Sequence, residues 1–581
     1  MNRPPRGGRG PFEPVVAVLA KRGRFLVAEP VFEPGDRVSV AAKAAGEGRA
    51  GDLVLVGGGK RGPRVVRRIG RPNVARDVLE GLMLHHGLRR SFPRQVDEEA
   101  ADAAAAPVDE SSRRDLRELP TFTIDPVDAR DFDDAVSAVE EGNGRTRVWV
   151  HIADVSAYVR SDGVTELEAF RRGTSVYVPG AVEPMLPQAL SNDACSLRPG
   201  VDRRAVTVEM EMDGPEVRSV AFHRSLIRSD ARLDYDQVDA IFAGSERAQD
   251  PWAQPLAVAR SVAAALGEKR RARGSALEVE SEEPSFEFDD RGDVVAVHHD
   301  EQTESHRLIE QLMILANEQV ATFLEERKVP TLYRVHERPD PRSVEALAAK
   351  LEALGVPTPP VPQDMTPQQA ADAVGEISRR VAEYVRKTGR GQAVFHSLVL
   401  RALKKAFYSP RNLGHAGLAS ERYCHFTSPI RRYPDLVVHR GLLAAIGVDD
   451  DAPHSSEMDE AGAASSAAER RALQVERSAQ DVCFAFLLER VLREDWDQSF
   501  DGEIVGVIGA GVFIRFGAEG FEGFLPRRRI RGDRWHLSET ETALVGEHTG
   551  GAMKLGDPIE VKVDRVDAPR GRVDLVPEAS S

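Results

Sequence analysis

Cysteine is scarce in this chain of 581 residues: Cys195, Cys424 and Cys483 are the only three, far apart and without CxxC spacing. This argues against a disulfide framework or a zinc knuckle, and it favours a reducing compartment. Long apolar runs are missing as well, since no stretch approaches the roughly 20 residues that a membrane-spanning helix needs. The basic start of the chain is not followed by the apolar segment of a secretion signal. We therefore expect a cytoplasmic protein, neither secreted nor inserted in a membrane.

An excess of positive charge is also absent, because the formal net charge is −15 at pH 7. This argues against a non-specific coat for nucleic acid, which needs a positive field, but it leaves room for a local basic channel. Arginines do cluster locally, at residues 64–68, 431–432 and 527–529. Residues 1–14 are expected to form a disordered tail, with RNA contact by the Arg-Gly stretch at 6–10 as the alternative.

Acid, by contrast, is concentrated in one short stretch. Five aspartates lie within ten residues: Asp125, Asp128, Asp131, Asp133 and Asp134. Two carboxylates about 4 Å apart repel each other by roughly 4 kcal/mol at an effective dielectric near 20, so converging carboxylates need a cation among them. Hard oxygen ligands favour Mg²⁺, with Mn²⁺ as a substitute.

An acidic loop in solvent is the competing interpretation of this stretch. Three features favour a cluster held in place: residues 121–124 have strand character, Pro126 keeps Asp125 extended, and Phe132 supplies an apolar anchor between two of the aspartates. A calcium EF-hand loop is rejected, because the sixth position from Asp125 is not glycine and Val136 stands where the bidentate glutamate belongs.

Short apolar segments separated by Gly- and Pro-bearing turns occur near both ends of the chain, at residues 15–71 and 501–575. Five short strands in such a length are typical of a small OB-type β-barrel. The elements expected between the barrels are a helix at 74–88, a low-complexity linker at 97–107, strands at 147–152 and 206–211, and helices at 304–325, 393–408 and 465–493.

The predicted fold class is therefore multidomain, with one large α+β domain flanked by two small β-barrels. The length of the chain suits about three or four domains with separate cores. The expected divisions are a tail at 1–14, a barrel at 15–72, a helix and linker at 73–115, the α+β domain at 116–447, a linker and helix at 448–496, and a barrel at 497–578.

Three further strings accompany the aspartates: His-Ile-Ala-Asp-Val at 151–155, the stretch 172–197 that contains Arg-Gly-Thr-Ser-Val-Tyr-Val-Pro-Gly, and Thr-Ser-Pro-Ile-Arg-Arg-Tyr-Pro-Asp at 427–435. Together they resemble the ribonuclease II / ribonuclease R family over nearly the whole chain. The resemblance implies a cold-shock-like barrel, an RNB catalytic domain and a C-terminal RNA-binding barrel of the ribosomal-protein type. It also implies Mg²⁺-dependent, processive 3′-to-5′ hydrolysis of single-stranded RNA to nucleoside 5′-monophosphates. The sequence itself gives no sign of an obligate protein partner.

The resemblance gives the aspartates distinct roles. Asp125, Asp131, Asp133 and Asp134 match the family's four acidic positions. They would hold two Mg²⁺ ions, one generating the attacking hydroxide and one stabilising the departing 3′-oxygen. Asp128 matches none of these positions and is expected to be solvated.

Four other residues match family positions that contact RNA. Arg431 resembles the arginine at the scissile phosphate, where a bidentate guanidinium stabilises developing charge, and it is predicted to be catalytic together with Asp133. Tyr177 matches an aromatic that stacks on a base near the 3′ end, with a core tyrosine as the alternative. Tyr235 and Glu310 match positions that contact the terminal ribose, whose 2′-hydroxyl distinguishes RNA from DNA.

Several neighbouring polar residues are weaker candidates. Glu310 and Asn317 share a helix face, so a plain polar face competes with ribose binding. Arg432 is equally well explained as an ordinary ion-pair partner. The remaining weak candidates are His425, His439 and Arg440, and a metal site at residues 298–300 is declined because nothing completes its ligand set.

The chain also departs from the family's pattern. One barrel and a helical piece fill the space before Asp125, where ribonuclease R relatives often carry two cold-shock-like barrels. Ala416 replaces a common phenylalanine, and Ala510 and Arg527 stand where RNA-stacking Phe and His are common, so the last barrel is expected to bind more by charge. The rival functions are a catalytically silent RNA-binding or RNA-chaperone protein, and a metal phosphatase or DNA exonuclease.

Overall fold

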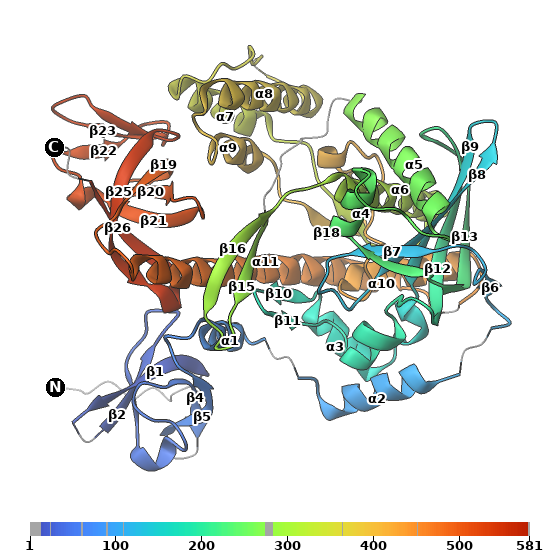
Figure 1. The fold of residues 1–581 in the computed structure, drawn as a ribbon, viewed down its shortest axis with the longest axis horizontal. Helices are drawn as coiled ribbons and strands as arrows, with labels where there is room; N and C mark the ends of the chain where they lie inside the picture. The colour runs from blue at the N-terminus through green and yellow to red at the C-terminus, as the bar shows by residue number, and fades with distance from the viewer. Residues whose placement is uncertain are drawn as a thin grey trace.

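The computed structural model describes residues 13–23, 25–59, 62–88, 91–107, 110–272, 283–362, 364–449 and 451–578. Two β-barrels lie at one side of the molecule and a large α+β domain lies at the other (Figure 1). The tail expected at residues 1–14 falls outside the described residues, except for Glu13 and Pro14. Within these ranges, the helices lack the combination of length and apolar character that crossing a bilayer requires.

The first barrel is an antiparallel sheet of five strands in the order β3-β2-β1-β4-β5. β3 also contacts β5, so the sheet curls toward closure. Ala17 and Leu19 of β1 and Val54 and Val56 of β4 fill its interior, as the two-residue period of a strand requires. All five expected strands are found. They are β1 (Val15–Arg22), β2 (Phe25–Pro30), β3 (Val38–Val40), β4 (Leu53–Gly59) and β5 (Gly62–Gly70).

Two helices, α1 (Ala75–His85) and α2 (Arg94–Ala105), follow the first barrel. The first is the helix expected at 74–88. The second occupies the segment expected to be a linker at 97–107, and that expectation is wrong. Alanine has the highest helix propensity, and the helix buries Val96 and Ala100, of which Ala100 belongs to a core of the central domain.

The central domain is built on a sheet of seven strands in the order β14-β7-β8-β9-β12-β13-β6. Val136 and Val150 on one face pack toward α5 (Ala253–Ala272) and α6 (Glu304–Glu326), while Ala135 on the opposite face belongs to a second core. The expected strands at 147–152 and 206–211 and the helix at 304–325 are all found. The sheet strands are β6 (Arg114–Asp115), β7 (Phe122–Asp125), β8 (Asp134–Gly142), β9 (Arg145–Ala153), β12 (Asp202–Asp213), β13 (Glu216–Arg228) and β14 (Ala231–Asp234).

Smaller elements surround this sheet. The helix expected at 393–408 ends at Ala402, and Tyr408 lies instead in β18, where it pairs with Arg334 of β17. The additional helices are α3 (Val164–Arg172), α4 (Tyr235–Phe242), α7 (Pro341–Ala353), α8 (Pro367–Thr388), α9 (Phe395–Ala402) and α10 (Tyr433–Ala445). The paired strands are β10 (Val176–Val178) with β11 (Ala181–Glu183), β15 (Glu283–Phe288) with β16 (Val294–Asp300), and β17 (Tyr333–Val335) with β18 (Phe407–Ser409).

One long helix, α11 (Met458–Leu492), crosses the whole molecule (Figure 1). It starts earlier than the helix expected at 465–493, and its 35 residues span about 50 Å at 1.5 Å per residue. Along its length it contacts α1, strand β10 of the central domain and strands β25 and β26 of the last barrel. This helix therefore packs against α1, the central domain and the last barrel.

The C-terminal barrel is closed, with the order β19-β20-β21-β26-β25, as expected for a second OB-type barrel. A separate sheet of three strands, β22-β23-β24, is inserted between β21 and β25 and was not expected from the sequence. The strands are β19 (Ser499–Ile508), β20 (Gly511–Phe516), β21 (Phe521–Pro526), β22 (Trp535–Leu537), β23 (Ala543–Gly546), β24 (Ala552–Lys554), β25 (Pro558–Asp567) and β26 (Arg572–Pro577).

Candidate active site

A cavity of about 470 Å³ in the central domain is lined by side chains from β7, β8, β10, α4, α6 and the loop that precedes α10. We call it the acidic cavity. It brings together every residue for which the sequence predicts a site role: Asp125, Asp131, Asp133, Asp134, Tyr177, Tyr235, Glu310 and Arg431.

The ends of two neighbouring strands place the first of these side chains. Asp125 is the last residue of β7, and β14 runs parallel to β7 with Asp234 in register with Asp125. The carboxyl ends of parallel strands lie at the same edge of a sheet, so Tyr235, which follows Asp234, emerges beside Asp125. Asp134 begins β8, the strand on the other side of β7.

The loop between β7 and β8 is braced from both sides. Phe132 is buried, its backbone N–H donates to Ser196 Oγ over 3.1 Å, and its carbonyl accepts from Leu197 N over 3.0 Å. Arg232 Nη2 donates to the carbonyls of Pro126 and Val127, over 2.5 and 2.7 Å. These contacts make the stretch an anchored cluster and exclude the freely solvated loop. Asp128 is exposed and outside the cavity lining, as the sequence predicts.

The carboxylates of the cavity are poorly compensated by positive charge. Burial raises the pKa of Asp125 to about 7, and the charge of Asp134 adds to that shift. Burial also raises the pKa of Asp134 to about 6, against the opposing charge of Arg431. Burial raises the pKa of Asp133 well above its ordinary value, although Arg431 lies beside it. The charges of Arg431, Arg432 and Arg232 lower these pKa values but do not offset the effect of burial, so the cavity favours a further cation.

The donor set fits a hard divalent cation. Oδ2 of Asp125 and Oδ2 of Asp133 are buried without a hydrogen-bond partner among the described residues, although the second forms an ion pair with Arg431. Across the same residues, no three His, Cys, Asp or Glu side chains already converge as a closed ligand set. Asp131 is instead held by Tyr177 Oη, and Asp133 Oδ1 accepts from Ile430 N over 2.9 Å. The cavity supplies carboxylate oxygens, the type of ligand that Mg²⁺ prefers. Hydrogen bonds from neighbouring residues orient these carboxylates.

Arg431 reaches the aspartates from the loop before α10. Its Nε lies 3.3 Å from Asp133 Oδ2, and its Nη2 donates to Ser428 Oγ over 3.2 Å. Its carbonyl accepts from Ser175 N over 2.9 Å, which ties this loop to the start of β10. The side chain remains 47% exposed, so the outer part of the guanidinium is free to meet a ligand in the cavity.

Tyr177 lies on β10, two residues after Ser175, and the residue is 39% exposed. It is therefore not a core tyrosine. Its Oη donates to Asp131 Oδ2 over 3.2 Å, and its backbone N–H donates to Glu476 Oε1 of α11 over 3.0 Å. Glu476 was not singled out from the sequence, because it lies 299 residues away in the chain and no local pattern connects the two.

Tyr235 and Glu310 face the cavity from α4 and α6. The Tyr235 ring stacks on His306, with centroids 3.7 Å apart and planes at 11°, and Glu310 follows His306 by one helical turn. Within the described residues Glu310 makes no side-chain hydrogen bond or ion pair, so its carboxylate is available. Asn317 is buried instead, donating to Tyr423 Oη over 3.1 Å and accepting from Phe426 N over 2.9 Å. Glu310 and Asn317 therefore do not form one solvated polar face.

The weaker candidates have structural partners. Arg432 donates to both carboxylate oxygens of Asp435, over 3.0 and 2.7 Å, which supports the ion-pair interpretation. Arg440 pairs with Glu166 in the interior. The histidines are similarly engaged: His425 with Tyr408 Oη, His439 with the Phe426 carbonyl, and His299 with the Glu519 carbonyl.

Comparison with known proteins agrees with this arrangement. A family model of the RNB domain matches residues 113–447, and a model of the S1 RNA binding domain matches residues 496–576. Ribonuclease R of Aquifex aeolicus is 35% identical over 588 residues, covering 97% of this chain and 81% of that protein. Ribonuclease R of Escherichia coli is 34% identical over 513 residues, covering 84% of this chain and 60% of that protein.

A solved structure shows the same fold. Mycoplasma genitalium RNase R in complex with ribose methylated single-stranded RNA superimposes with a TM-score of 0.86 at 24% identity, over 100% of this chain and 93% of that chain. The RNB match spans more than half of the present chain, and the A. aeolicus match spans nearly all of it. The chain therefore belongs to the ribonuclease R family of RNB-domain exoribonucleases.

Proposed function

We propose that this protein is a Mg²⁺-dependent exoribonuclease that degrades single-stranded RNA processively from its 3′ end and releases nucleoside 5′-monophosphates. The observation that carries the proposal is the acidic cavity, where the aspartates, a half-exposed arginine and an unpaired glutamate face one space. The 3′-to-5′ direction and the nature of the product come from the family resemblance of the motifs at 125–134, 172–197 and 427–435. The cytoplasm is the proposed compartment, because all three cysteines are free and buried.

The protein residues would divide the work as follows. Arg431 would hold the scissile phosphate by two guanidinium N–H groups and stabilise the charge that develops on it. Tyr177 would stack on a base, and Glu310 would accept a hydrogen bond from the 2′-hydroxyl of the terminal ribose beside Tyr235. Asp125, Asp131, Asp133 and Asp134 would hold Mg²⁺, which when bound activates water and stabilises the leaving oxygen.

The alternative is a catalytically silent RNA-binding or RNA-chaperone protein on the same scaffold. The presence of all four aspartates and of Arg431 within one cavity favours the enzyme. A DNA exonuclease or a phosphatase is disfavoured by the two flanking barrels and by the available Glu310 carboxylate.

One assay separates these functions. The full chain is incubated with Mg²⁺ and either a 5′-labelled single-stranded RNA or its DNA copy, with EDTA in a parallel reaction. We expect the RNA to be converted to a short limit product without a ladder of intermediate lengths, the DNA to stay intact, and no products to form with EDTA. RNA binding without products would establish the silent protein, and equal degradation of RNA and DNA would refute the proposed ribose selection.

A further inference from the structure

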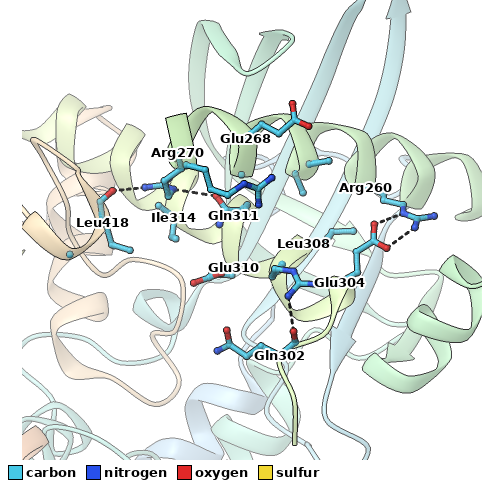
Figure 2. A pocket seen from close by; sticks show the side chains of 16 residues that line it. Arg260, Glu268, Arg270, Gln302, Glu304, Leu308, Glu310, Gln311, Ile314 and Leu418 are labelled. Carbon is cyan, nitrogen blue, oxygen red and sulfur yellow. Dashed lines mark hydrogen bonds and ion pairs between the residues drawn. The ribbon is translucent and has the colours of Figure 1, made fainter. Parts of the chain in front are cut away.

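A second cavity, of about 560 Å³, lies between α5 and α6 (Figure 2). Glu310, Ile314 and Leu418 line both this α5–α6 cavity and the acidic cavity, so the two spaces adjoin at these three residues. The volume falls within the range of about 300–1,000 Å³ that is usual for sites that take small organic ligands. No role for this space follows from the motifs that led to the acidic cavity.

Two arginines keep the walls of the α5–α6 cavity in place. Arg260 makes two hydrogen bonds of 2.6 Å to the Glu304 carboxylate, which joins α5 to the start of α6. Arg270 donates to the Leu418 carbonyl over 2.8 Å and to Gln311 Oε1 over 3.2 Å (Figure 2). These two guanidiniums are engaged by the protein itself and connect the elements that form the cavity walls.

Two further arginines remain available to a ligand. Arg307 donates to the Gln302 carbonyl over 2.9 Å but meets no carboxylate in the part of the chain that the structure describes. Arg271 makes no hydrogen bond or ion pair with any described residue, and its Nη1 lies over the surface of α5 near Gly267. An exposed guanidinium without a carboxylate partner is a strong site for a phosphate group.

The lining of the cavity does not suit an RNA strand. A track for single-stranded nucleic acid combines basic groups with aromatic side chains on which successive bases stack. The described lining contains no aromatic residue, and its α5 wall is built from the small residues Ala263, Ala264 and Gly267. The lining carries four arginines and three glutamates, and this small excess of positive charge suits a small anion that is held briefly and then released.

The position of the cavity also points to release rather than entry. Both barrels lie on the left of the molecule in Figure 1, whereas α5 and α6 lie on the upper right. An RNA chain that reaches the aspartates from the barrels occupies that side of the acidic cavity throughout processive cleavage. The cleaved nucleotide then needs another way out, and the α5–α6 cavity adjoins the acidic cavity at Glu310 of α6.

We propose that the α5–α6 cavity is the release site for the nucleoside 5′-monophosphate product, with Arg271 and Arg307 receiving its phosphate. This proposal rests on the proposed exoribonuclease function. The ligand of the cavity would be a mononucleotide with a terminal phosphate. The cavity would act in the departure of this product after each cleavage.

The first test obstructs the cavity at Gly267. A Cβ at this position would meet nothing closer than Arg271 Nη1 at 3.9 Å, so a side chain there projects into open space. Gly267→Phe should leave cleavage of the first nucleotide unchanged in rapid-quench experiments and slow the following turnovers, giving a burst and then a slow phase. Gly267→Ala is the matched control, because it removes helical glycine and adds a single methyl group. Equal steady-state rates for the two variants at wild-type level would overturn the proposal.

The second test measures binding without turnover. Equilibrium dialysis of 5′-AMP against the full chain is done in EDTA, so that no metal at the aspartates recruits the phosphate. The double variant Arg271→Glu/Arg307→Glu should raise the Kd for AMP by about tenfold or more, which corresponds to about 1.4 kcal/mol. Arg386→Glu, which reverses an exposed charge on α8, should leave it unchanged. An unchanged Kd in the double variant, or no AMP binding by an enzyme that degrades RNA, would overturn the proposal.

The two tests also distinguish this proposal from the proposed function. If the wild-type chain does not hydrolyse RNA but binds AMP through Arg271 and Arg307, the exoribonuclease function fails and the mononucleotide site stands. If RNA is hydrolysed and neither the Gly267 nor the arginine variants change turnover or AMP binding, the function stands and the release site fails.

Discussion

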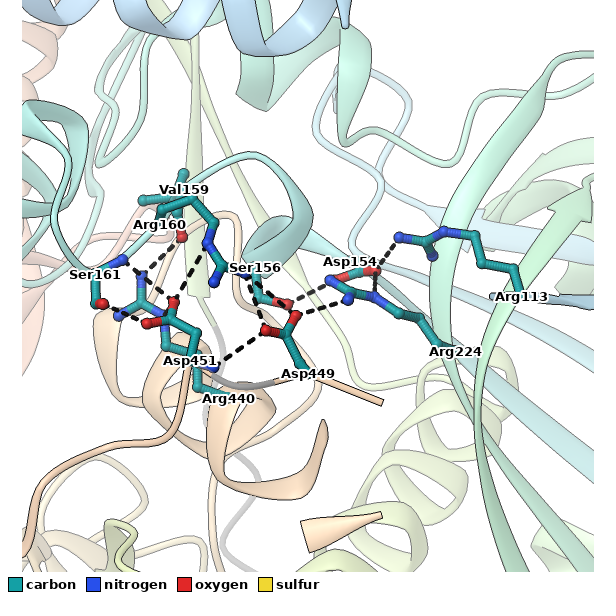
Figure 3. A network of polar contacts seen from close by, with 10 residues as sticks. All are labelled: Arg113, Asp154, Ser156, Val159, Arg160, Ser161, Arg224, Arg440, Asp449 and Asp451. Atoms are coloured by element: carbon teal, nitrogen blue, oxygen red, sulfur yellow. Dashed lines mark hydrogen bonds and ion pairs between the residues drawn. The ribbon is translucent and has the colours of Figure 1, made fainter. Parts of the chain in front are cut away.

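Asp154, in the His-Ile-Ala-Asp motif, is the centre of a buried ion-pair network (Figure 3). Its Oδ2 accepts from Arg113 Nη2 and from Arg224 Nε, each over 2.7 Å, and its Oδ1 accepts from Ser156 Oγ over 2.7 Å. The side chains of Asp154, Arg113 and Arg224 are 0%, 5% and 11% exposed. Arg224 continues the network to Asp449, beyond the end of α10, the helix that follows Arg431.

We predict that Asp154→Asn destabilises the central domain strongly. Removing one partner of a buried ion pair costs about 3–5 kcal/mol, because the remaining charge is left without compensation. Asparagine still offers one carbonyl acceptor, and Arg224 still has its ion pair with Asp449. We therefore expect a loss of stability at the lower end of this range, about 3 kcal/mol. At roughly 2 °C for each kcal/mol in a large domain, the melting temperature should fall by about 6 °C.

Differential scanning fluorimetry of the full chain measures this fall, and hydrogen exchange of β9, β12 and β13 localises it. Asp213→Asn is the matched control, since its partner Arg218 and Asp213 itself are 64% and 46% exposed. Exposed pairs of this kind contribute about 0–1 kcal/mol. If Asp154→Asn melts at the same temperature as Asp213→Asn, the network does not stabilise the domain and the reasoning is refuted.

The stability difference between wild type and Asp154→Asn should also depend on pH. Burial alone would raise the pKa of Asp154, but the charges of Arg224 and Arg113 outweigh it and hold the pKa well below its ordinary value. A depressed folded-state pKa stabilises the fold above the unfolded value, about 3.9, and that contribution is lost as the pH falls further. The stability difference between wild type and Asp154→Asn should therefore have its full value at pH 7 and become smaller as the pH falls below about 4.

Three further predictions concern the acidic cavity. Asp133→Asn should lower turnover by at least about a hundredfold, as loss of one electrostatic group at a reaction centre commonly does. RNA affinity in filter binding should stay near wild type. A variant that keeps a tenth of the wild-type rate would remove Asp133 from the mechanism. Tyr177→Ala loses about 1–3 kcal/mol of stacking and should lengthen the limit product on a sequencing gel, whereas an unchanged end product would show that no base rests on this ring. Glu310→Ala should narrow the ratio of RNA to DNA cleavage, and an unaltered ratio would place sugar recognition elsewhere.

The errors in the expected elements have separate physical causes. The segment at 97–107 contains several alanines, which favour a helix without help from the rest of the fold. The local sequence therefore already predicted a helix, and its interpretation as a linker did not take this propensity into account. Tyr408 is different, because its strand conformation comes from pairing with β17, more than 70 residues earlier in the chain. Strand propensity depends on such partners, which a local pattern does not contain.

The sequence by itself determined the two barrels, the strand and helix periods of the central domain, and the identity of the acidic stretch from Asp125 to Asp134, because these are local patterns of apolar spacing and charge. Only the tertiary structure decided which groups meet. Sheet order places Tyr235 beside Asp125, and the packing of α10 brings Ile430 N to Asp133 Oδ1 across 297 residues. The adjoining α5–α6 cavity is likewise a product of packing, since two helices with ordinary sequences create it only when they lie side by side.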